Sequence, residues 1–180
     1  MNMPLTAIEQ AIINAALEFA NLPQIESVDQ VLGIFMPVAE GTQSPLFQTI
    51  RDRDVGAFVD DRAQLLEWLD TIGRRRHTKA DRENIWANLR MVLGDTVRGD
   101  AIWALTPQGT LTSTARPLLA GVQACTAFAA ALLLDRNRRL DRGLQQCELP
   151  ECRKWFFAWR PTGAPRKLCC PAHDSPQPVQ

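Results

Sequence analysis

The amino-acid sequence predicts a mainly α-helical protein: a helical N-terminal domain with one β-hairpin, followed by a small C-terminal unit built around metal-ligating residues. Apolar residues recur at three- and four-residue spacing through most of the chain, as in helices packed on a core. The period changes once, where residues 101–105 and 111–114 flank a Pro/Gly turn and predict the hairpin. Four potential metal ligands then crowd into residues 147–173.

The first third of the chain predicts one long and one short helix. The long helix covers residues 5–21, where Thr6 and Glu9 stand three residues apart in the capping-box pattern that begins many helices. The short helix is expected at residues 28–36, and the composition of residues 41–45 predicts a loop after it.

Three longer helices are expected next, and the last is the most apolar segment of the chain. They are predicted at residues 53–72, 79–97 and 116–138. The run 118–134 has no charged residue, yet its 17 residues fall short of the roughly 20 that a membrane span needs. We therefore expect a buried core helix that holds Cys125 as a small hydrophobic residue.

Composition and motifs narrow the class of protein. Hydrophobic residues make up 46% of the chain and charged residues 22%, which is typical of a globular protein. The N-terminus lacks the basic region and apolar stretch of an export signal, so we expect a cytoplasmic protein with no membrane span. No Gly-rich phosphate loop, nucleophile elbow or recognisable carboxylate pair occurs, so we expect no enzymatic activity.

The net charge is zero, but the two ends of the chain differ in sign. Residues 1–73 hold 3 basic and 11 acidic residues, a net of −8. Residues 74–134 hold 8 basic and 4 acidic residues, a net of +4, and residues 135–167 hold 9 and 4, a net of +5. This gradient indicates that the basic rear meets either an anionic partner or the acidic front of the same chain.

The C-terminal ligands follow the pattern Cys147-x4-Cys152-x16-Cys169-x3-His173. Two ligand pairs separated by a spacer are typical of a structural Zn²⁺ site, which takes four tetrahedral ligands and leaves no open position. Cys170 is an alternative third ligand, but Cys169 is favoured because it stands four residues before His173, on the same face of a helical turn. The segment therefore predicts a small treble-clef or ribbon-like zinc finger.

Aromatic and basic residues lie between the two ligand pairs. The aromatic side chains either pack a small core or stack on a nucleic-acid base; they are Trp155, Phe156, Phe157 and Trp159. The basic side chains are candidate phosphate contacts or a solvated surface that balances the charge of the metal centre; they are Arg153, Lys154, Arg160, Arg166 and Lys167. A second basic cluster at residues 74–79 is expected to be a solvated connector between helices.

The C-terminal segment resembles the CGNR zinc finger, which follows an α-helical ABATE domain in bacterial stress-associated transcriptional regulators. The matching features are the basic lead-in at residues 138–140, Cys147-x4-Cys152, the aromatic strand 155–157 and Arg166-x-x-Cys169. Upstream, residues 17–21 and 65–69 are similar to early segments of that family. The chain diverges at the tetrad that names the family, where residues 173–176 read His-Asp-Ser-Pro.

The resemblance implies an ABATE-like helical domain at residues 1–140 and a CGNR-like zinc finger at 141–174. The Pro-rich composition of residues 175–180 predicts a disordered tail. The resemblance also implies DNA binding and transcription regulation, with the helical domain sensing a small ligand or a protein partner. The alternative is a non-enzymatic interaction or ligand-sensing protein whose zinc site is purely structural. The missing tetrad favours this alternative, whereas the basic finger favours nucleic-acid binding.

Overall fold

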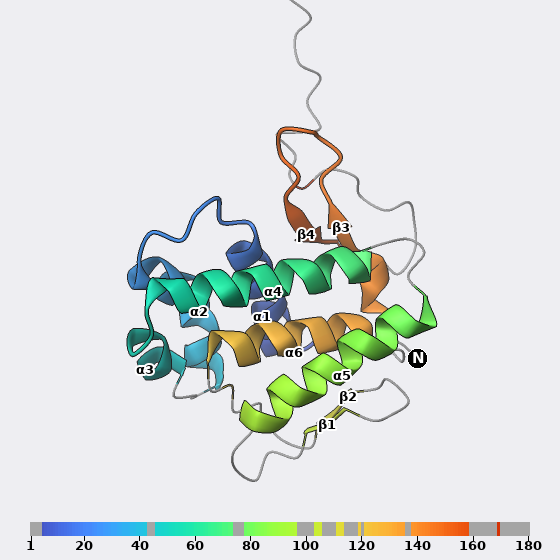
Figure 1. Ribbon diagram of the computed structural model, residues 1–180, viewed down its shortest axis with the longest axis horizontal. Coiled ribbons are helices and arrows are strands. Elements are labelled where there is room, and N and C mark those ends of the chain that lie inside the picture. Colours follow the sequence, from blue (N-terminus) through green and yellow to red (C-terminus); the bar gives the residue numbers. More distant parts are fainter. Residues whose placement is uncertain are drawn as a thin grey trace, which may run out of the picture.

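The computed structural model describes residues 5–42, 46–73, 78–96, 103–105, 111–113, 119, 121–135, 138–158 and 169. Its helices are α1 (Ala7–Ala20), α2 (Val28–Thr42), α3 (Leu46–Arg51), α4 (Val55–Gly73), α5 (Lys79–Thr96), α6 (Val122–Leu134) and the short 3₁₀ helix η1 (Leu140–Gly143). Its strands are β1 (Trp103–Leu105), β2 (Leu111–Ser113), β3 (Leu144–Gln146) and β4 (Trp155–Phe157). The predicted mainly helical fold with a β-hairpin is confirmed (Figure 1).

Helix α6 forms the centre of the core. It contacts α1, α4 and α5, and every side chain along it except Gln123 is buried. Cys125 is 0% exposed, as expected, and burial raises the pKa of its thiol. None of the helices in the described ranges has the length and hydropathy that crossing a membrane requires.

The start of α1 is stabilised by the predicted capping box. The Thr6 side chain accepts a hydrogen bond from the Glu9 backbone N–H at 3.3 Å, and the Glu9 carboxylate accepts one from the Thr6 N–H at 2.8 Å. The same carboxylate pairs with Arg138 at 2.7 Å, so the chain beyond α6 is tied to the first turn of α1.

The structure differs from the predicted helices at α2, at α3 and at both ends of α6, which begins at Val122 rather than at residue 116. Helix α2 runs to Thr42 and contains Pro37, because burial of Val38 (0% exposed) outweighs the loss of one helical hydrogen bond. A six-residue helix, α3, follows at a place where no helix was predicted. Helix α6 ends at Leu134 rather than 138, since the backbone of Asp135 leaves the helical region with ψ near 114°.

Each pair of strands is antiparallel. In the predicted hairpin, Ala104 lies opposite Thr112. In the C-terminal ribbon, Gln145 of β3 lies opposite Phe156 of β4. The ribbon lies against the helices, with β4 contacting α1 and β3 contacting α4, while the loop that joins the two strands projects away from them (Figure 1).

The β4 strand falls where an aromatic strand is predicted. A return of the chain at residues 166–168, which would complete a hairpin with this strand, lies outside the described residues. The structure pairs β4 with β3, which lies just before the first cysteine of the ligand pattern. The two ligands Cys147 and Cys152 are therefore both in the connection between β3 and β4.

Candidate metal centre

Three cysteines meet at the end of the β3–β4 ribbon. The Sγ atoms of Cys147, Cys152 and Cys169 all lie within 4.8 Å of one another, and those of Cys152 and Cys169 are 3.5 Å apart. Cys147 is 2% exposed and the other two are half-buried. None of the cysteines in the described part of the chain is in a disulfide.

The spacing of these sulfur atoms suits a thiolate-bound metal ion. A tetrahedral zinc with Zn–S bonds of about 2.3 Å places its sulfur ligands about 3.8 Å apart. The described residues therefore offer three candidate ligands for an ion that accepts four. The fourth predicted ligand, His173, and the alternative Cys170 lie outside the described residues.

The connection between the strands is a tight turn that directs two thiols to one side. The Cys147 N–H donates to the Lys154 carbonyl at 2.9 Å and thereby extends the β3–β4 ladder by one residue pair. The N–H groups of Cys152 and Arg153 both donate to the Leu149 carbonyl, at 3.1 and 3.2 Å. Arg153 adopts a left-handed backbone with φ of 47°, which reverses the chain toward β4.

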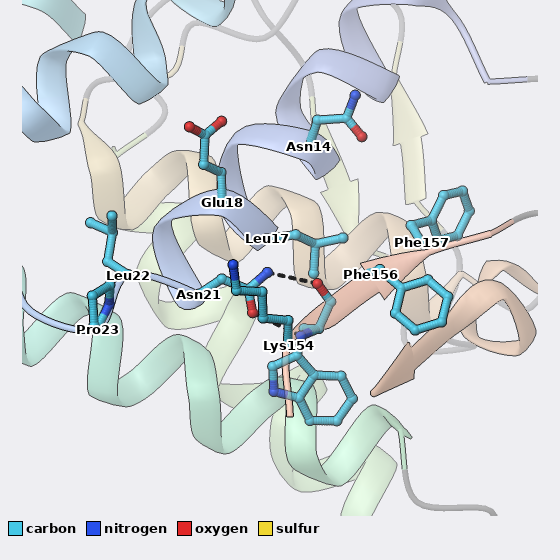
Figure 2. Close-up of a pocket in the computed structure, with 10 residues that line it drawn as sticks. Asn14, Leu17, Glu18, Asn21, Leu22, Pro23, Lys154, Phe156 and Phe157 are labelled. Carbon is cyan, nitrogen blue, oxygen red and sulfur yellow. Dashed lines mark hydrogen bonds between the residues drawn. The ribbon is translucent and has the colours of Figure 1, made fainter. Parts of the chain in front are cut away.

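The strand after the cysteines is fixed to the helices by Asn21, the C-cap residue of α1. The Trp155 N–H donates to Asn21 Oδ1 at 2.7 Å, and Asn21 Nδ2 donates to the Trp155 carbonyl at 2.7 Å (Figure 2). Trp155 lies between Lys154 and Phe156 in an alternating antiparallel ladder, so both its backbone groups point away from β3. Asn21 lies at the end of the helix predicted over residues 5–21, but its pairing with β4 has no local sequence signal.

The aromatic side chains of β4 mostly pack inward. Trp155 is 9% exposed and its indole lies on Gly73, the last residue of α4, while Phe157 packs on Gly143 and the core. The packing interpretation is thus confirmed for these two residues. Phe156 is half-buried and is one of the residues that line the pocket drawn in Figure 2, and Trp159 lies outside the described residues.

An open cleft of about 510 Å³ lies between α1 and β4 (Figure 2). Polar side chains at its edge include Asn14, Glu18 and Lys154, while Leu17 and Phe156 supply apolar surface. Its mixed lining does not single out a ligand chemistry.

The predicted phosphate contacts are only partly described. Arg153 and Lys154 are exposed next to the cysteine cluster, whereas Arg160, Arg166 and Lys167 lie outside the described residues. Glu148 and Glu151 are exposed on the same turn, so the described surface near the cluster carries both signs of charge. The basic segment 74–77 is also outside the described residues.

Comparison of the chain with protein-family models and with curated proteins finds no match. The similarity to CGNR fingers and ABATE domains therefore stays a prediction from sequence motifs. Independently of any family, two cysteines of the β3–β4 connection and a third that follows 17 residues later lie close enough together to hold a metal ion.

Proposed function

We propose that this protein is a zinc-containing, non-enzymatic regulator that binds nucleic acid through its basic C-terminal finger. The observation that carries the zinc assignment is the meeting of Cys147, Cys152 and Cys169 within 4.8 Å. Thiolates select zinc among the common divalent ions of a reducing compartment, and His173 completes a Cys₃His ligand set. Its role is structural, because four protein ligands leave no position for a reacting water.

Nucleic-acid binding is supported by charge and by the family resemblance. Arg153 and Lys154 are exposed beside the cluster, and the chain from residue 135 to 167 has a net charge of +5. Cations held on a metal-stabilised turn are suited to contact phosphates, since the turn fixes their spacing. These contacts would give affinity with little sequence preference, because phosphates are the same at every base.

The proposal is tested by measuring binding of the zinc-loaded protein to duplex DNA across a salt series. The logarithm of the affinity falls with the logarithm of the salt concentration, and each phosphate contact makes this slope steeper by about 0.9. Replacing Arg153 and Lys154 together by alanine should therefore make the slope shallower by about 2. The matched control is Arg90→Ala, which removes an exposed cation of α5 and should leave the slope unchanged. Absence of binding at low salt would contradict the proposal.

A second candidate function is a protein-interaction or ligand-sensing role in which the zinc is purely structural. The packing of the Trp155 ring on Gly73 and the pairing of its backbone with Asn21 favour this second function, because the aromatic side chain packs against the protein's own helices. This candidate predicts normal zinc content together with no nucleic-acid binding. The same salt series therefore separates the two functions.

A further inference from the structure

Asn21 lies far from the cysteines in sequence, yet it pairs with the strand that follows them. Its side-chain amide makes two hydrogen bonds of 2.7 Å with the backbone of Trp155, one as donor and one as acceptor (Figure 2). Leu17 (6% exposed) and the Trp155 side chain (9% exposed) flank these bonds. Because both hydrogen bonds are part-buried, the pairing is stronger than it would be on a fully exposed surface.

This pairing is directly connected to the cysteine turn. Trp155 follows Lys154, whose carbonyl accepts the hydrogen bond from the Cys147 N–H at 2.9 Å. Cys152 is only three residues before Trp155 in sequence. The placement of Trp155 on α1 therefore restricts where both Cys147 and Cys152 stand.

We infer that Asn21 is a positioning residue for the metal site, an inference that rests on the proposed zinc binding. Asn21 does not contact the metal. It holds β4 in the position that brings Cys147 and Cys152 together with Cys169. Metal binding and the docking of β4 on α1 are consequently coupled, and the coupling is reciprocal: each strengthens the other by the same factor.

The test is the zinc dissociation constant of the full-length protein, measured by competition with a chelator. Asn21→Ala removes both hydrogen bonds and should weaken zinc binding about tenfold. Asn21→Asp should also weaken it, because a carboxylate oxygen then faces the Trp155 carbonyl with no hydrogen between them. The matched control is Asn14→Ala, which changes an exposed asparagine of the same helix and the same cleft, hydrogen-bonded to Gln10. It should bind zinc as the wild type does.

A role confined to general stability gives a different result. In that case, Asn21→Ala lowers the denaturation midpoint by the same amount with and without zinc. The zinc dissociation constant of the variant then equals that of the wild type. That result overturns the inference while the proposed zinc site stands. A wild-type protein that binds no zinc overturns both.

The wild-type protein provides a second measurement that does not depend on whether a variant folds. Hydrogen exchange of the Trp155 backbone amide reports the hydrogen bond to Asn21 directly. Zinc should slow this exchange about tenfold, in proportion to the coupling. Equal exchange rates in the zinc-loaded and metal-free protein overturn the inference.

Discussion

At the scale of single residues, two glycines make room for the aromatic side chains that attach the C-terminal ribbon. A Cβ on Gly73 would lie 2.6 Å from the Trp155 ring, and one on Gly143 would lie 2.7 Å from the Phe157 ring. Both distances are too short for carbon atoms in contact. The rings lie where they do because these positions have no side chain.

Replacing Gly73 by alanine should therefore destabilise the protein despite the higher helix propensity of alanine. We expect a loss of about 1–3 kcal/mol in the free energy of unfolding, the usual cost of overpacking. The measurement is chemical denaturation, with Gly33→Ala as control. A Cβ at Gly33 meets nothing within 4 Å, so that change in α2 should stabilise by about 0.5–1 kcal/mol. Equal effects of the two changes would contradict this account.

Cys125 should differ from the other four cysteines in its reactivity. It is fully buried in α6, and because burial raises the pKa of its thiol, the reactive thiolate is scarce at neutral pH. After chelation of the metal, an alkylating reagent should modify the C-terminal cysteines within minutes. Mass spectrometry should detect modification of Cys125 only in denaturant. Rapid labelling of Cys125 in the folded protein would show that α6 is not the core helix.

Sequence alone could predict the residues whose partners lie close in sequence. Thr6 and Glu9 were predicted from a three-residue pattern, and Cys147 and Cys152 from ligand spacing. Sequence does not predict the pairing of Asn21 with Trp155, because 134 residues separate the partners and a side-chain amide can accept from any backbone N–H and donate to any backbone carbonyl. Such a contact is specified by tertiary packing and has no local signal.

At the scale of elements, the sequence predicts long and strongly apolar helices more accurately than it predicts short helices and strands. The sequence predicts helix α6 because its long run has no charged residue and few polar ones, which favours burial on nearly every side. Helix α3 was missed because six residues give less than two turns, and burial of Leu46 and Ile50 rather than propensity stabilises it. Strand β3 has the sequence Leu-Gln-Gln, too short to show an alternating pattern.

The central role of α6 gives a prediction at this scale. Leu132 is 0% exposed, so Leu132→Ala should lower the free energy of unfolding by about 2–5 kcal/mol. Val59→Ala on α4 removes an apolar side chain that is 49% exposed and should change it by less than about 0.5 kcal/mol. Thermal or urea denaturation compares the two. A small effect at Leu132 would place the core elsewhere.

At the scale of the whole molecule, a largely buried ion pair joins the acidic front of the chain to its basic rear. Arg138 of the basic segment pairs with Glu9 of the acidic segment, and both side chains are largely buried. Arg153 and Lys154 are exposed, so part of the positive charge faces solvent. Arg138 thus stabilises the fold, whereas the exposed cations Arg153 and Lys154 support the proposed binding of an anionic partner.

Chelation should affect the two parts of the molecule unequally. The β3–β4 ribbon consists of three-residue strands and should depend on the proposed metal for its turn, whereas helical side chains make up most of the hydrophobic core. After removal of the metal, hydrogen exchange should accelerate in residues 144–157 and stay slow in α6. Loss of protection throughout the chain would mean that the helical domain also depends on the metal.

The central claim is that the C-terminal cysteines bind zinc, and elemental analysis of the native protein tests it most directly. We predict about one zinc per chain in the wild type, little in Cys152→Ser, and the wild-type amount in Cys125→Ser, which removes a buried thiol outside the cluster. Native protein without zinc, or Cys152→Ser with full occupancy, would contradict the claim.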